Sequence, residues 1–132
     1  MSEEKNNESE NDVGSISVSE EVVAIIAGAA AAEVPGVYGM SGGIAGDIAE
    51  ILGRKNLAKG VKVKLIEKEA TIDLYIVVEF GHRIPNMAWD IQEKVKGAVE
   101  SMSGLNVIEV NIHVQGVNFD KEKEKSSSLE KN

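Results

Sequence analysis

The chain has two histidines, His82 and His113, and no cysteine, so few of its side chains suit metal binding or nucleophilic catalysis. Neither histidine belongs to an H-x-x-x-H or H-E-x-x-H motif, so the sequence predicts no metal site. His113 falls in an alternating segment, where it is either an ordinary surface residue or a ligand. Without a thiolate, cysteine catalysis and thiol redox switching are excluded.

Carboxylates are numerous, but their spacing selects no catalytic pair. Asp47, Glu50, Asp73 and Glu79 could meet in space, yet nothing in the sequence chooses two of them for acid–base chemistry. No G-x-S-x-G motif occurs, and no G-K-[ST] follows the glycines to hold a phosphate. The sequence therefore predicts a non-enzymatic protein without a cofactor.

Anion binding is the one chemistry for which several residues are suited. The segment from Gly43 to Gly46 has the G-x-x-G spacing with which KH domains clamp a nucleic-acid backbone, although it contains no Lys or Arg. A basic stretch follows, and two more residues precede a predicted helix, whose N-terminal N–H groups could add to an anion site. These candidates are Arg54, Lys55, Lys59, Lys62, Lys64, His82 and Arg83. Such a charge run is also typical of a solvated face.

Apolar residues at steps of three and four predict a helix that begins around Pro85 and ends near Gly104. Proline suits the first turn because its missing N–H has no partner there. The expected buried stripe is Ile84, Ala88, Ile91, Val95, Ala98 and Met102.

Trp89 lies on the other side of this helix. At about 100° per residue it falls roughly 160° from Ile91, so we expect it to face outward. Its polar neighbours on the wheel are Glu93, Lys96 and Glu100. The tryptophan either folds back onto the preceding loop or anchors a partner, with Glu93 and Lys96 beside it.

Apolar and polar residues alternate over 61–65, 71–80 and 108–115, which predicts three strands, with shorter strands at 14–18 and 37–40. A short connection makes the first two antiparallel. In the last strand the expected buried residues are Ile108, Val110, Ile112 and Val114. Tyr75, Val77 and His113 point to the opposite face, where burial does not require them. They are candidate partner contacts.

A second helix is predicted from Ser19 to Val34, before Pro35. Ser17 and Glu20 have capping-box spacing, and Ser19 is a competing N-cap. Alanines and aliphatic residues surround this helix, so either one face is buried or the remaining surface serves self-association.

These elements predict a two-layer α+β domain. Its sheet is mostly antiparallel, two long helices pack on one face, and a glycine-rich loop carries a short helix. The composition divides the 132 residues into an acidic disordered arm at 1–13, a single domain at 14–118 and a charged disordered tail at 119–132.

Charge and hydropathy limit the protein's location and partners. The start is acidic and polar, unlike a signal peptide. The longest weakly polar run, Val22 to Ala32, is shorter than the ~20 residues of a membrane span, so we expect no direct membrane insertion. A net charge of −8 argues against nucleic acid as a partner and against anionic lipid.

Three segments together resemble the alkaline shock protein family of Gram-positive bacteria, also called the general-stress or envelope stress response family. The resemblance covers residues 14–119. Its most specific parts are the strand from Asp73 to Glu79, the helix start Arg83-Ile84-Pro85, and the closing segment from Asn111 to Val117.

The resemblance implies a cytoplasmic, non-enzymatic protein that is needed under alkaline or cell-envelope stress. Family members self-associate, and some are held at the inner face of the membrane by a membrane-embedded partner. The leading hypothesis is thus a homo-oligomeric scaffold or adaptor that meets a membrane-anchored envelope protein. The alternative is an RNA-binding module that uses the G-x-x-G loop and the basic residues.

Overall fold

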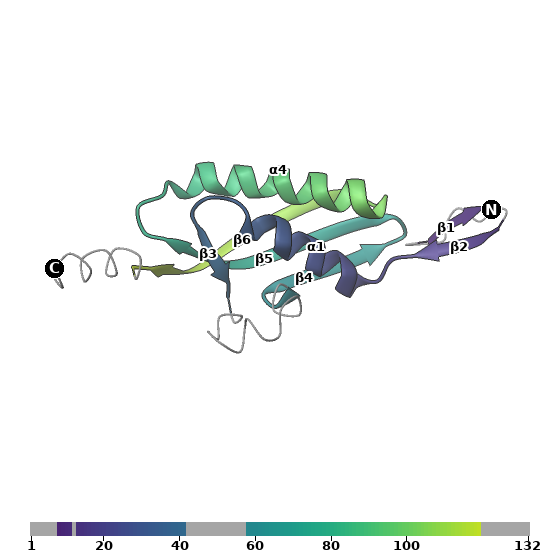
Figure 1. The fold of residues 1–132 in the computed structure, drawn as a ribbon, viewed down its shortest axis with the longest axis horizontal. Helices are drawn as coiled ribbons and strands as arrows, with labels where there is room; N and C mark the ends of the chain where they lie inside the picture. Colours follow the sequence, from purple (N-terminus) through teal and green to yellow (C-terminus); the bar gives the residue numbers. More distant parts are fainter. Residues whose placement is uncertain (1–7, 12, 42–57, 120–132) are drawn as a thin grey trace, which may run out of the picture.

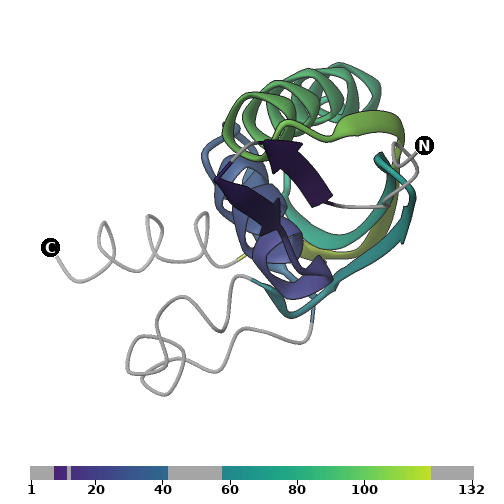
Figure 2. The same cartoon turned by 90° about the vertical axis from the view of Figure 1, so that its right-hand side faces the viewer.

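The computed structural model describes residues 8–11, 13–41 and 58–119, which form two layers (Figures 1 and 2). The elements are β1 (Glu8–Asn11), β2 (Gly14–Ser17), α1 (Glu20–Ala32), β3 (Val37–Met40), β4 (Val61–Ile66), β5 (Glu69–Glu79), α4 (Ile84–Ser103) and β6 (Asn106–Asn118). Four strands form a curved sheet, and α1 and α4 lie on one side of it (Figure 2). The predicted two-layer α+β class is confirmed. The glycine-rich loop and its short helix lie outside the described residues.

β5 is the central strand of the sheet. On one edge β4 pairs with its first half and β3 with its second half, both antiparallel. Tyr75 joins the two, because its N–H donates to Gly60 and its carbonyl accepts from Ser41. On the other edge β6 runs parallel to β5. Two of these three pairings are antiparallel, as predicted, and the third is parallel because α4 carries the chain back across the sheet.

β6 departs from simple alternation at two places. Its register against β5 shifts after Val107 and again after Val114, each time by one extra residue. The first bulge turns Ile108 outward, where 53% of its surface is exposed. The expectation that Ile108 is buried was therefore wrong, and Val107 takes its place in the core. Val114 is also largely exposed, against expectation.

The helix α1 begins at the competing cap, because the N–H of Val22 donates to the Ser19 hydroxyl. Its buried residues are Val23, Ala24, Ala27, Gly28, Ala30 and Ala31, which cover one broad face. The single-face interpretation therefore describes the helix, although Val22 remains half exposed.

The helix α4 has the predicted ends. Pro85 lies in its first turn, and Gly104 caps it in the left-handed conformation, with φ 80°. Its buried residues are Met87, Ile91, Val95 and Val99, each four residues from the next. The core thus follows one i+4 ridge of the helix rather than the predicted mixture of steps. Ile84 and Met102, at the two ends of the predicted stripe, are exposed.

A small hairpin projects from one end of the body (Figure 1). β1 pairs with β2 in an antiparallel register from Glu8↔Ser17 to Asn11↔Gly14. This strand pairing differs from the composition-based expectation of disorder for that part of the acidic arm.

Candidate interaction surface

The face of the sheet opposite the helices carries an ordered aromatic pair. Tyr75 of β5 and His113 of β6 are register partners, and both point away from the core. Their rings stack with centroids 4.5 Å apart and planes inclined by 12°. Parallel pairing brings the two side chains together although 38 positions separate them in the sequence. The stack presents a flat surface that is half exposed.

Charged side chains from the neighbouring positions hold this pair. The Asp73 carboxylate lies 3.0 Å from Nε2 of His113, with 31% and 42% of the two side chains exposed. From the other edge, Lys62 places its ammonium 5.4 Å from the Tyr75 ring centroid, within the range of a cation–π contact. We call Lys62, Asp73, Tyr75 and His113 the open-face cluster. It offers an aromatic surface with one acid and one base but no nucleophile, so it suits binding.

Val77 extends the same face toward the end of the sheet. Its register partner is Gly116, and a side chain at Gly116 would come within 3.7 Å of the Val77 methyl groups. The Ser41 hydroxyl donates to the Gln115 amide oxygen nearby in sequence, at 3.0 Å. Val77 is half buried and lies on the same face as Tyr75.

Trp89 lies in the helical layer, on the other side of the sheet from the open-face cluster. Its side chain is 62% exposed, so the outward orientation expected from the helical wheel is confirmed. The structure therefore divides the candidate partner contacts between two surfaces, one on the open face and one on α4.

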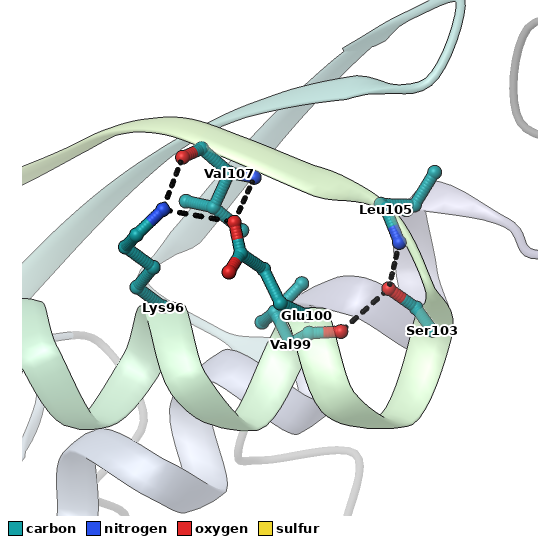
Figure 3. A network of polar contacts seen from close by, with 6 residues as sticks. All are labelled: Lys96, Val99, Glu100, Ser103, Leu105 and Val107. Atoms are coloured by element: carbon teal, nitrogen blue, oxygen red, sulfur yellow. Dashed lines mark hydrogen bonds and ion pairs between the residues drawn. The ribbon is translucent and has the colours of Figure 1, made fainter.

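Lys96 contributes to the internal structure (Figure 3). Its ammonium donates to Glu100 at 2.8 Å and to the Val107 carbonyl at 3.2 Å. The Glu100 carboxylate in turn accepts the Val107 N–H at 2.9 Å. The hydrogen bond from Lys96 lowers the pKa of the Glu100 carboxyl below its ordinary value, and the bond from Val107 also lowers it. These contacts fasten α4 to the start of β6.

The end of α4 is fastened to β6 by a second side chain (Figure 3). The Ser103 hydroxyl donates to the Val99 carbonyl at 2.6 Å and accepts the Leu105 N–H at 3.1 Å. It thereby holds the turn at Gly104, where the helix ends and the chain enters β6.

Glu93 lines a shallow hollow between the end of α1 and the second turn of α4. The hollow has a volume of about 400 Å³, and the other residues around it are Glu33, Val34, Pro35, Asp90 and Lys94. Lys94 forms an ion pair with Glu33 at 3.3 Å. Three carboxylates and one ammonium give the hollow a negative balance.

The candidate anion-binding residues are only partly described. Lys59, Lys62 and Lys64 are exposed on and beside β4, whereas Arg54, Lys55 and the G-x-x-G segment lie outside the described residues. His82 is engaged elsewhere, because Nε2 lies 3.6 Å from Glu79 and the ring packs against Gly36.

Arg83 is the N-cap residue of α4, and its side chain makes no capping hydrogen bond. The structure thus does not join His82 and Arg83 to the lysines of β4 by any contact that we observe. Within the described ranges, no three His, Asp or Glu side chains are grouped so that they could hold a metal ion.

Sequence reasoning found Tyr75 and His113 but not their contact or the part of Asp73 in it. Alternation shows which face a residue occupies, whereas the contact depends on the register of two strands that are not adjacent in the chain. The placement of Asp73, Tyr75 and His113 on polar faces was the one available signal.

Comparison with known proteins gives the family. Residues 8–119 match the alkaline shock protein 23 family, whose function is described as cell envelope-related. The chain belongs to this family. The resemblance seen in the sequence is thereby confirmed.

Relatives of this alkaline shock family protein occur in other Gram-positive bacteria. YqhY of Bacillus subtilis (strain 168) is 43% identical over 108 residues, which cover 82% of this chain and 80% of that protein. YloU of the same strain is 42% identical over 79% of this chain and 88% of its own length. A Streptococcus pyogenes protein named as a homologue of the stress response regulator gls24 is 30% identical over 76% of this chain and 57% of its own length.

Among solved structures, a chain titled MamM CTD M250L matches with a TM-score of 0.45 and 20% identity, over 73% of this chain and 95% of that one. At this score the similarity says nothing about function. Neither helix in the described ranges is both long enough and apolar enough to cross a membrane.

Proposed function

We propose that this protein is a non-enzymatic scaffold or adaptor of the envelope stress response. It self-associates in the cytoplasm and is held at the inner face of the cell membrane by a membrane-anchored protein. The envelope-related family and the gls24 homologue support the stress context. Trp89 is the observation that carries the proposal, because a tryptophan with 62% of its surface in solvent is a candidate anchor for a partner.

The open-face cluster supplies the second contact surface of the proposal. An aromatic stack that needs no covering layer to stay ordered can receive a partner with little rearrangement, which lowers the entropic cost of binding. Trp89 and the cluster lie on different faces of the molecule. One surface can therefore contact a second copy while the other contacts the membrane-anchored protein.

Fractionation of native host cells tests this function. Cells would express the tagged full chain, and membranes would be washed in high salt before the bound proteins are identified. We expect recovery with one co-purifying membrane protein, and loss of that recovery in the variants Trp89→Glu and Tyr75→Glu. Met102→Glu is the matched control, because Met102 is also an exposed apolar residue of α4 but lies at the opposite end of the helix.

Unchanged recovery in correctly folded Trp89→Glu and Tyr75→Glu variants would contradict the proposed surfaces. A complex that is released by nuclease and weakened steeply by salt would instead favour RNA binding. The contact between Lys62 and Tyr75 keeps that second function under test, because a cation beside an aromatic ring can hold a stacked base.

A further inference from the structure

The outer edge of β6 is covered by α4 over its first half. The N–H of Val107 donates to Glu100, and its carbonyl accepts from Lys96. Gln92 donates to the Val110 carbonyl at 3.0 Å. An edge strand otherwise presents such backbone groups to any strand that meets it. Three side chains of α4 therefore block pairing at this part of the edge.

The direction of the backbone groups further along β6 follows from two hydrogen bonds. The Asn106 N–H donates to Lys68, and the Asn118 carbonyl accepts from Phe80, so both residues face β5. Backbone groups alternate between the two edges of a strand, and the bulge after Val114 adds one residue to this alternation.

The second half of the outer edge is consequently presented by Ile112, Val114 and Val117. We observe no backbone partner for these outward groups within the described ranges. The side chains of Val114 and Val117 are also 37% and 45% exposed. This open segment, Ile112 to Val117, can accept and donate hydrogen bonds to a further strand.

The open segment lacks the features that usually protect a strand edge. Such edges carry charged residues or proline, which discourage pairing. From Val110 to Phe119 the chain contains no Asp, Glu, Lys, Arg or Pro. Trp89 precedes Gln92 by three positions, so it lies within about 60° of Gln92 on the helix surface, on the side of β6. The tryptophan thus marks the point where the cover by α4 ends.

We infer that a second copy of this chain adds its own β6 to the open segment, antiparallel to the first, so that two sheets join into one. The inference rests on the self-association in the proposed function and names its surface. Two copies with a net charge of −8 each repel one another, and this uncharged edge is a place where they can meet without that cost. A strand that pairs with itself about a two-fold axis matches its own donors and acceptors, as a closed dimer requires.

Sedimentation of the full chain across protein concentration tests the inference. We expect a dimer for the natural sequence, and a dissociation constant at least tenfold higher for Val114→Lys. Lysine at an edge discourages pairing but leaves the backbone unchanged. Met102→Lys makes the same change at an exposed apolar position of α4 and should leave the dimer intact.

Amide hydrogen exchange of the natural chain gives an independent readout if Val114→Lys folds poorly. The Ile112 and Val114 amides should gain protection as concentration rises. The Val107 amide, which Glu100 holds within one copy, should be protected at every concentration. A dimer whose Ile112 and Val114 amides stay unprotected would overturn the edge pairing and leave self-association standing.

A chain that is monomeric at every concentration would overturn both the edge pairing and the self-association, while membrane recruitment would still be measured separately by fractionation. Protection of the edge amides that appears only when the membrane protein is added would overturn the second copy as occupant and assign the edge to that protein.

Discussion

The two faces of β5 are built from alternate residues of one strand, yet they are completed in different ways. On the inner face Ile72, Leu74 and Ile76 are fully buried under the helices. On the outer face Asp73 and Tyr75 are half exposed, and their order comes from contacts within the sheet. The inner face therefore supplies stability by apolar burial, whereas the outer face contributes little to stability and is available for binding.

The largest effect should come from the inner face. Leu74→Ala removes a fully buried side chain at the centre of the sheet and should lower the free energy of unfolding by about 2–5 kcal/mol. Urea denaturation followed by circular dichroism measures this change. Thr71→Ala on the outer face of the same strand is the control and should change stability far less. Equal losses for the two variants would remove the distinction between the faces.

An intermediate effect should appear where α4 is fastened to β6, and it should depend on pH. The pKa of Glu100 is lower than its usual value of 4.5 in the folded chain, because the ionised carboxylate accepts hydrogen bonds from Lys96 and Val107. Its stabilising contribution is therefore fully present above about 4.5 and is lost as pH falls through the lower folded pKa.

Glu100→Gln tests this dependence. The variant should be less stable than the natural chain at neutral pH, and the difference should shrink as the pH falls below 4.5. Urea midpoints measured between neutral pH and pH values below 4.5 would show it. A stability difference that stays constant over this range would contradict the assignment of the carboxylate to these bonds.

The smallest effect on stability should come from the open-face cluster. Tyr75→Ala, His113→Ala and the double variant form a cycle whose coupling energy should be about 0.2–1 kcal/mol, the range of a cross-strand pair. Partner capture should fall much more than stability in the same variants. A coupling of several kcal/mol would mean that the cluster maintains the fold and would weaken its proposed part in binding.

The sequence was sufficient where a local pattern has one structural solution. The strict alternation in β5 identified both of its faces, because neighbouring side chains of a strand must point in opposite directions. Pro85 and Gly104 marked the ends of α4, since each suits only one end of a helix. The outward position of Trp89 followed from the same periodicity.

The tertiary structure decided what depends on pairing between distant segments. The parallel register of β5 and β6 placed His113 against Tyr75 and Asp73, and no local pattern contains that register. The bulge after Val107 reversed the expectation for Ile108, because one extra residue turns the following side chains to the other face.

The sequence by itself determined the secondary structure, the family resemblance and which residues lie outside the core, because these follow from short-range periodicity and motif. Only the tertiary structure decided which of those outward residues meet, and where the edge of β6 is covered and where it is open. The physical reason is that the helix α4 and the two strands beside it are joined by specific backbone and side-chain hydrogen bonds, and residue order alone does not specify which groups form them.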